Sequence, residues 1–378
     1  MRIKAAGRPV IRASALAIAF VATLVGGTVF SGAVFGGAVL GSTVLGGTAQ
    51  AATLASGTPV LTVSAARQRL ASDLGVDVYL NPYGTAAQQQ ADDARILNYV
   101  VSLGANAVAI DFLFGTNGLR PTKVYGTAGK TPSVSYVALA VQQARARGLR
   151  VLIRPLLDES NLGGRWRGVI APRNVNGWFA SYWQFLKPYL QAARQHGAQA
   201  FDLGVELDSL STDTAQWSSL ERSASQVFKG QLPVAINHDQ WISPPAALPE
   251  PYPAVDAYPV LAGTSTSQLT AAWSAWLGER SANVRTHTMV QEAGIAAVRG
   301  AQAAPWKLYT GSPIDVAVQR NWLTAACSAV RLAGMPGIYF YGIVSSDNPA
   351  VAPTSADTFS FVDRGDAAIK SCFNAVWK

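Results

Sequence analysis

Eight apolar runs that alternate with amphipathic segments restrict the fold of this chain more than any other feature. They are VDVYL from Val76, AVAIDFLF from Ala107, RVLIRPLL from Arg150, AFDLGVEL from Ala200, PVAIN from Pro233, AVDAYPV from Ala254, TMVQEA from Thr288 and GIYFYGI from Gly337. Because these runs are continuously apolar and do not alternate with polar residues, they indicate strands buried on both faces. Eight such strands with helices between them predict an α/β protein with a single (β/α)8 barrel over residues 71–378.

A doubly wound open sheet is the alternative architecture for such a pattern. The nucleotide-binding versions of that fold carry a glycine-rich phosphate loop after the first strand, and none follows VDVYL here. The segment after PVAIN contains five prolines between residues 244 and 253, so we expect only a short helix there. The barrel therefore remains the preferred prediction, without a second domain or an internal repeat.

The first 51 residues have the pattern of an export signal. Four basic residues up to Arg12 precede a long uncharged run, which ends in Ala49-Gln50-Ala51, a small-x-small cleavage pattern. The run is long enough to span a membrane, so anchoring through residues 13–48 is the competing interpretation. Residues 52–70 are expected to be a linker. Both interpretations place the folded part outside the cytoplasm, secreted or on the cell surface.

The composition narrows the possible partners. Removing the signal leaves 26 of the 30 basic residues against 22 acidic ones, without a basic cluster that would track a phosphate backbone, so nucleic acid is not expected as a partner. Ten Trp and twelve Tyr in a chain with only 14% charged residues suit an uncharged ligand such as a sugar, although core packing also uses aromatics. Cys327 and Cys372 fit either a disulfide, which export permits, or two buried thiols. We expect a monomer.

Two glutamates close predicted strands at the end where barrel enzymes carry their chemistry. Glu206 ends the fourth strand and Glu292 ends the seventh, so their side chains can converge over the barrel mouth. Glycoside hydrolysis needs such a carboxyl pair, one to donate a proton and one to attack the anomeric carbon or activate water. Tyr258 is placed to donate a hydrogen bond to Glu292, and Arg154 to favour its ionised form. A structural ion pair is the alternative role for either glutamate alone.

Other common catalytic arrangements are not found in the sequence. The three histidines, including His238, lack the spacing of metal ligands such as H-E-x-x-H, and no G-x-S-x-G nucleophile elbow occurs. We therefore expect neither a catalytic metal nor a cofactor.

The order and spacing of several segments resemble glycoside hydrolase family 113, a group of retaining (β/α)8 glycosidases typified by β-mannanases. The resemblance runs from about residue 76 to residue 341. It is carried by NAVAIDF at Asn106, KTPS at Lys130, LRVLIRPLLD at Leu149, RWRGVIAP at Arg165, WFASYWQFL at Trp178, DLGVEL at Asp202, VDAYPVL at Val255 and VQEAGIAAVRGAQAAPW at Val290.

The resemblance implies a retaining hydrolase of β-linked polysaccharide or oligosaccharide. By position, Glu206 corresponds to the acid/base and Glu292 to the nucleophile, with the two carboxyl groups about 5–5.5 Å apart. The candidates for substrate contact are the rings of Trp166, Trp306 and Tyr341 and the polar groups of Arg154, Asn237, His238 and Tyr258.

Three positions depart from the related enzymes. Val205 stands before the proposed acid/base where many relatives have asparagine, the fifth strand continues as INHDQW, and the eighth reads YFYG where a tryptophan usually floors the sugar site. These differences widen the expected substrates from mannan to bacterial envelope or exopolysaccharides. They also motivate an alternative, an inactive barrel that binds glycan at a surface, while a transglycosylase would share the same intermediate.

Overall fold

The computed structural model describes residues 60–244 and 253–377 and contains the predicted barrel. Nine strands form its curled wall: β1 (Asp73–Tyr79), β2 (Ala107–Thr116), β4 (Arg150–Leu157), β5 (Ala200–Phe201), β6 (Gly204–Val205), β7 (Val234–Asn237), β8 (Pro253–Asp256), β9 (Met289–Ala293) and β10 (Gly337–Val344). Neighbouring strands are parallel, in the order β5-β4-β2-β1-β10-β9-β8-β7-β6. The short β3 (Val124–Tyr125) pairs with β2 in the antiparallel sense.

The two ends of this sheet are successive pieces of one predicted strand, the fourth. β5 pairs with β4, whereas β6 pairs with β7. Between them the backbone bonds to each side in turn: the amide of Asp202 donates to Ile153 O at 2.9 Å, and that of Leu203 donates to Pro233 O at 2.8 Å. The run predicted as one strand is thus interrupted, because its first part pairs with β4 and its second part with β7, and it links the two ends of the barrel wall.

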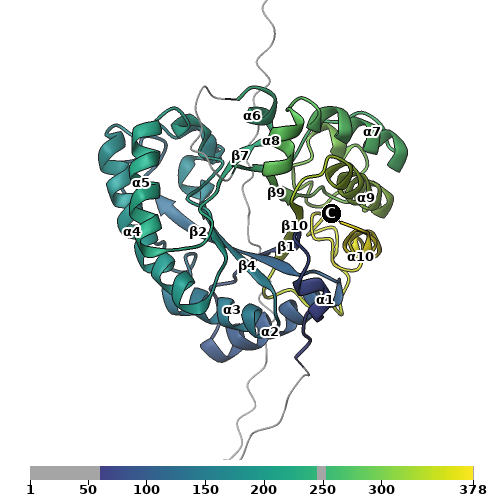
Figure 1. Cartoon of the computed structure of the whole chain (residues 1–378), viewed down its shortest axis with the longest axis horizontal. Coiled ribbons are helices and arrows are strands. Elements are labelled where there is room, and N and C mark those ends of the chain that lie inside the picture. Colours follow the sequence, from purple (N-terminus) through teal and green to yellow (C-terminus); the bar gives the residue numbers. More distant parts are fainter. Residues whose placement is uncertain (1–59, 245–252, 378) are drawn as a thin grey trace, which may run out of the picture. The chain divides into compact units, whose positions relative to one another are not determined.

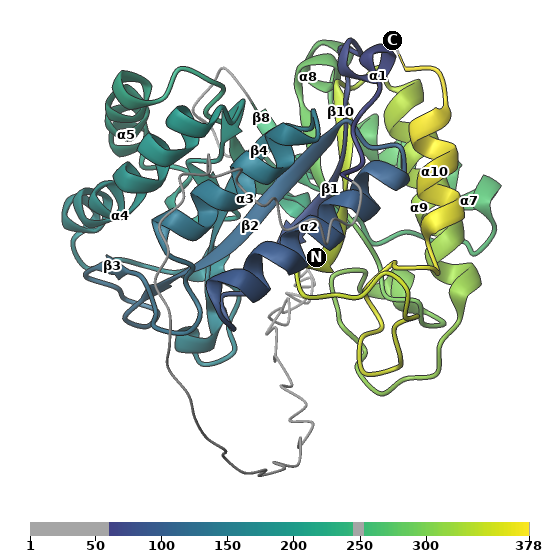
Figure 2. The same cartoon turned by 90° about the horizontal axis from the view of Figure 1, so that it is seen from below.

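Helices surround the strands in both views (Figure 1, Figure 2). They are α1 (Ala65–Gln68), α2 (Ala86–Ser102), α3 (Val134–Ala146), α4 (Val175–His196), α5 (Thr214–Val227), α6 (His238–Ile242), α7 (Thr266–Leu277), α8 (Ala282–His287), α9 (Val316–Leu332) and α10 (Asp366–Asn374). The five residues of α6 agree with the short helix expected after PVAIN. Within the described residues, no helix is long and apolar enough to cross a membrane.

Local sequence explains where the larger helices begin. Thr85 and Gln88 form a capping box at the start of α2, and the side chain of Asn174 accepts the amide proton of Gly177 at the start of α4. Gly197 ends α4 in the left-handed conformation, with φ at 80°. The caps at Thr85 and Asn174 fix two helix starts on the side of the carboxyl ends of the barrel strands, which is the end that carries the candidate site.

The barrel interior is layered. Its apolar layer consists of Ala107, Ala109, Leu152, Ala200 and Tyr339, with Met289 packed against them. The ring of Tyr339 lies against the backbone of Gly75, where a Cβ atom would be only 2.2 Å from the ring, so this position requires glycine. Side chains two residues apart on a strand point to the same side of the sheet. The next layer of the interior, closer to the barrel mouth, is therefore formed by the residues two positions further along each strand.

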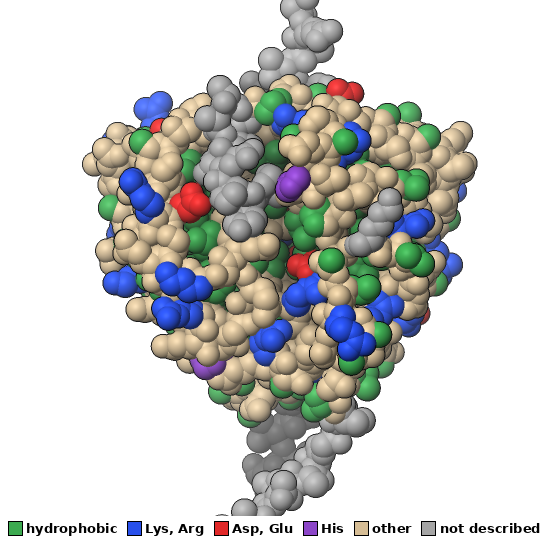
Figure 3. Space-filling view, viewed as in Figure 1, with side chains coloured by type: hydrophobic (Ala, Val, Ile, Leu, Met, Phe, Trp, Pro, Cys, Tyr) green, Lys and Arg blue, Asp and Glu red, His purple; other side chains and the backbone are tan. Residues whose placement is uncertain are grey.

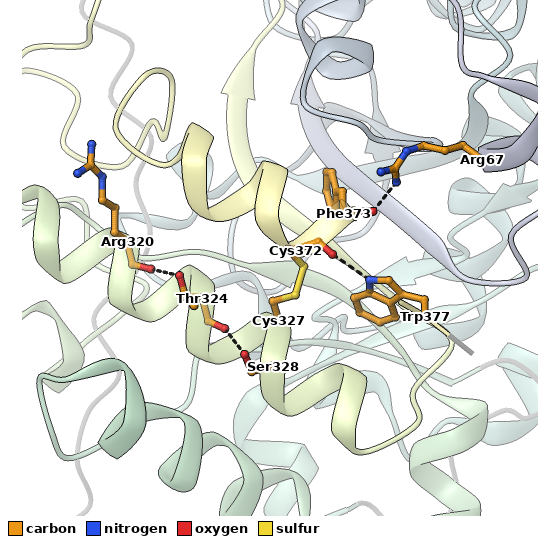
Figure 4. Close-up of a disulfide and its surroundings, with 8 residues drawn as sticks. All are labelled: Arg67, Arg320, Thr324, Cys327, Ser328, Cys372, Phe373 and Trp377. Carbon is orange, nitrogen blue, oxygen red and sulfur yellow. Dashed lines mark hydrogen bonds between the residues drawn. A yellow bond between two sulfur atoms is a disulfide. The ribbon is translucent and has the colours of Figure 1, made fainter. Parts of the chain in front are cut away.

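A disulfide between Cys327 and Cys372 joins α9 to α10, with the Cα atoms 5.8 Å apart (Figure 4). The sequence left this pairing open. Residues 61–70, at the end of the segment expected as a linker, include α1, and Val63 is buried with its amide bonded to Arg147 O at 2.7 Å. The predicted export signal, residues 1–51, lies outside the described residues.

Candidate active site

Glu292, on β9, is held at the barrel mouth by two donors. Arg154 Nη1 donates to its Oε1 at 2.7 Å, and the hydroxyl of Tyr258 donates to its Oε2 at 2.7 Å. The residue is 5% exposed, so its charge is compensated mainly by these groups and little by water. Both partners were expected from the sequence. A carboxylate that accepts two strong hydrogen bonds is fixed in one orientation, as a nucleophile requires.

Arg154 is a fully buried hub of this site. Besides Glu292, its guanidinium contacts Asp202 on the fourth strand, from Nε at 2.9 Å, and Asp256 on β8, from Nη2 to both oxygens at 2.8 and 2.9 Å. Gln291 fixes Asp202 in turn through its side-chain amide at 3.1 Å. The direct role expected for Arg154 towards substrate is therefore replaced by a role towards the nucleophile, because the guanidinium lies beneath the carboxylate and is closed off from solvent.

Two further carboxyl groups lie beside this hub. Asp77 on β1 and Asp111 on β2 are 3.8 and 3.9 Å from Arg154 Nη1, and both are fully buried. Their oxygens have no hydrogen-bond partner among the described residues. One guanidinium cannot balance five buried carboxylates, and burial together with mutual repulsion raises the pKa of both groups well above the usual range.

Glu206, directly after β6, has a different environment. Its Oε1 accepts from Asn237 Nδ2 at 2.6 Å and its Oε2 from Trp166 Nε1 at 3.1 Å. Burial raises the pKa of Glu206 to about 7, although the nearby Arg167 guanidinium opposes the rise, and the charge of Glu292 adds to it. A carboxyl group with a pKa near neutrality can donate and recover a proton in one catalytic cycle.

The backbone around Glu206 is specialised for this placement. Its φ of 53° lies in the left-handed region, which residues other than glycine rarely occupy. Nearby, the indole of Trp166 packs over Gly168, where a Cβ atom would lie 2.2 Å from the ring. The strained backbone at Glu206 and the glycine at position 168 together allow the Glu206 carboxyl group to accept a hydrogen bond from Trp166.

Arg167 and Glu159 were not predicted as site residues. Both side chains are buried, and Arg167 Nε lies 3.0 Å from Glu159 Oε1 and 3.9 Å from Glu206 Oε2. Arg167 is thus the positive charge that opposes the raised pKa of Glu206. The one sequence signal for this ion pair is the low overall content of charged residues. In such a chain, each charged residue beside apolar ones is a candidate for a buried ion pair.

The predicted sugar-contacting residues separate into two groups. His238 and Trp306 stack on each other, with ring centroids 5.0 Å apart and planes at 22°, and both are partly exposed. Burial lowers the pKa of His238 to about 4, so its ring is neutral, and its buried Nδ1 has no partner among the described residues. Tyr341, by contrast, is 6% exposed and packs edge-on against Tyr258 and Tyr79.

The arrangement is suited to acid/base and nucleophilic chemistry. Glu206 and Glu292 come from the ends of two non-adjacent strands and are electrostatically coupled, while their hydrogen-bond partners differ. Among residues 60–244 and 253–377, no three histidine, cysteine or acidic side chains are grouped to hold a metal ion. The expectation that no metal takes part remains a prediction.

The model of glycoside hydrolase family 113 matches residues 78–341, most of the chain. The chain belongs to this family. Its members are glycoside hydrolases, so the predicted enzyme class and the predicted fold are both confirmed. No curated protein matches the chain.

Solved structures with the same fold align with this chain over nearly their whole length. A family 113 β-mannanase from Alicyclobacillus acidocaldarius superposes with a TM-score of 0.67 over 81% of this chain and 98% of its own, at 16% sequence identity. A family 113 β-1,4-mannanase superposes with a TM-score of 0.69 over 81% of this chain and 99% of its own, at 15% identity. At such identity the likeness concerns the fold.

Proposed function

We propose that this enzyme is an exported, retaining hydrolase of β-mannan or a closely related uncharged β-linked glycan. The observation that carries the proposal is the asymmetry of the two glutamates. Glu292 is fixed by Arg154 and Tyr258, whereas Glu206 has a pKa raised to about 7 by burial. An ionised nucleophile and a protonated acid at the same pH are what double displacement requires.

In the first step a carboxylate oxygen of Glu292 attacks the anomeric carbon and the bond to the leaving oxygen breaks. Glu206 donates its proton to that oxygen, so the first product leaves as a neutral alcohol. In the second step water attacks the same carbon, Glu206 takes a proton from the water, and Glu292 is released. One water molecule is consumed for each glycosidic bond, and two inversions retain the anomeric configuration.

Asn237 supports the acid/base from an unexpected strand. Many relatives have asparagine directly before this glutamate, but here that position is the buried Val205. Asn237, at the end of β7, instead donates to Glu206 Oε1 at 2.6 Å. This bond fixes the orientation of the carboxyl group, whose other oxygen accepts from Trp166 Nε1 at 3.1 Å.

The proposed substrate class follows from the side chains that are available to contact a sugar. The stacked pair of His238 and Trp306 gives a flat wall, which is uncharged because the imidazole is neutral. Such a wall suits a neutral pyranose better than an acidic sugar. The structural neighbours of family 113 are β-mannanases, which favours mannan within that class. Export rests on the basic and uncharged segments of the first 51 residues.

The experiment compares Glu206→Gln and Glu292→Gln with Glu279→Gln, an exposed control. Reducing ends are measured on mannan, glucomannan and other β-glycans. We expect kcat to fall by about 10²–10⁴-fold for Glu206→Gln and at least as much for Glu292→Gln, with the control unchanged. If both site variants keep most of an active wild-type rate, the catalytic assignment is wrong. Glycan binding without any wild-type hydrolysis would instead support the inactive binding barrel.

A further inference from the structure

A groove of about 360 Å³ runs between α4 and α5 on the outside of the barrel. The two helices lie side by side in both views (Figure 1, Figure 2). The residues of α4 that line it, from Asn176 to Trp183, recur at spacings of three and four, so they form one face of the helix. Those of α5 lie between Ala215 and Ser223 with the same periodicity.

The chemistry of the groove is uncharged, and no acidic, basic or histidine side chain lines it. Phe179 and Leu220 are buried and line its apolar part, while Trp183 is partly exposed. Phe179 is engaged with the rings of Trp178 and Trp217, but Trp183 stacks on no other ring of the described residues. An indole with free area beside an apolar surface suits the C–H side of a pyranose.

Polar groups complete the wall. Gln216 Nε2 donates to Asn176 Oδ1 at 2.9 Å, which holds the two amides together. The bond uses the oxygen of Asn176 and the nitrogen of Gln216, so it leaves the side-chain NH2 of Asn176 and the side-chain carbonyl of Gln216 available, together with the hydroxyl of Ser219. A fixed donor next to a fixed acceptor matches neighbouring sugar hydroxyls, which both donate and accept.

The position of the groove connects it to the candidate site. Asn176 and Ala215 are the second residues of their helices, and both helices begin at the carboxyl ends of barrel strands, the end that carries the glutamates. The segment before α4 contains Trp166, and the segment before α5 begins at Glu206. The groove therefore starts at the rim of the active-site face on the side of the acid/base and continues down the outer wall.

We propose that this groove is a second glycan-binding site, which holds an uncharged β-linked chain outside the catalytic centre. The inference rests on the proposed function, since the occupant is the same kind of polymer. Such a site raises the local concentration of substrate by tethering the enzyme to a chain with many cleavage points. It predicts a difference between polymeric and short substrates that the catalytic residues alone do not produce.

The test uses Trp183→Ala, which removes the ring, and Ser219→Arg, which fills the groove and leaves the ring in place. Ser225→Arg is the matched control, because it puts the same side chain at an exposed position of α5 that does not line the groove. Binding is measured by retardation in native gels that contain soluble galactomannan. Catalysis is measured separately as hydrolysis of mannotetraose, which is too short to occupy both sites.

We expect both groove variants to bind galactomannan about tenfold more weakly while mannotetraose hydrolysis and the control stay at wild-type values. Wild-type retardation in both variants, with hydrolysis intact, would overturn the second site and leave the proposed function standing. A wild type that hydrolyses neither substrate would overturn the proposed function, and the retardation series would still decide on the groove. If wild type forms dimers that Ser219→Arg separates, the groove is a protein interface and the proposal is wrong.

Discussion

At the scale of single residues, the site depends on how differently two glutamates are solvated and paired. Glu206 meets neutral donors and a guanidinium at 3.9 Å, whereas Glu292 meets a guanidinium at 2.7 Å. The buried Arg154 cannot serve the substrate directly, so its contribution to catalysis passes through the nucleophile. Changes in the partners should therefore alter the pH dependence as well as the rate.

The alkaline limit of activity is the first consequence. Because Glu206 must be protonated to act as an acid and its pKa is raised to about 7, kcat/KM should fall as the pH rises through about 7. The bond from Trp166 lowers this pKa, so Trp166→Phe should move the alkaline limb to higher pH and lower the maximum. A pH–rate profile on a soluble mannooligosaccharide measures both. If the alkaline limb of the profile is unchanged in an active Trp166→Phe variant, the ionisation that limits the rate does not belong to Glu206.

At the scale of elements, apolar runs and helical periodicity were sufficient to predict the barrel. They place each strand end, and thereby Glu206 and Glu292, because a barrel exposes side chains there. They do not reveal which inward side chains bond across the interior. The hub at Arg154 and the bond from Asn237 to Glu206 join residues from different strands, and the pair of Arg167 with Glu159 joins two turns of the loop between β4 and α4. Such contacts depend on register and on loop paths that periodicity does not contain.

The interrupted fourth strand shows the same limit. Its eight residues are apolar enough for a continuous strand, but Asp202 must reach Arg154 and the backbone bonds to each neighbour in turn. Gly168 is a second case, because its need for glycine arises from a tryptophan two residues earlier. Neither is visible without the packed structure.

The disulfide leads to a prediction at this scale, because it joins α10 to α9 across 45 residues of sequence. Closing a loop of that length removes entropy from the unfolded chain, so Cys327→Ser or Cys372→Ser should lower the free energy of unfolding by about 2–4 kcal/mol. Urea unfolding of each variant, with the reduced wild type as a control, measures the loss. Equal midpoints for oxidised wild type and both variants would show that the bridge contributes no stability.

At the scale of the whole molecule, the surface and the interior differ in charge. The Lys and Arg side chains in the view of Figure 3 are spread over that face and form no single patch, consistent with the absence of a basic cluster in the sequence. The interior instead concentrates acid, with five carboxyl groups around one guanidinium. Stability should therefore depend on pH through the barrel core more than through surface pairs.

The sign of this dependence follows from the pKa values. Asp77, Asp111 and Asp256 have raised pKa values in the folded state because burial disfavours their charge. The folded protein keeps protons that the unfolded chain loses above pH about 4, so stability should decline as the pH rises from there. Asp77→Asn removes one such group. The free energy of unfolding of this variant minus that of wild type should therefore be larger at pH 8 than at pH 4.5.

Urea unfolding at the two pH values tests this, with Asp92→Asn on α2 as a control for a partly exposed aspartate in a surface ion pair. The control should change stability by less than about 1 kcal/mol at either pH. If the difference between Asp77→Asn and wild type were the same at both pH values, Asp77 would not be protonated in the folded protein.

The central claim is that Glu292 forms a covalent bond to the sugar, and trapping that intermediate tests it most directly. A 2-deoxy-2-fluoro-β-mannosyl fluoride slows both steps but leaves a good leaving group, so the glycosyl-enzyme should accumulate. Mass spectrometry of the intact protein and of its peptides should then find one fluorosugar on Glu292, with no labelling in Glu292→Gln. Time-dependent inactivation with the label on another residue, or an active wild type that inverts the anomeric configuration, would contradict the account.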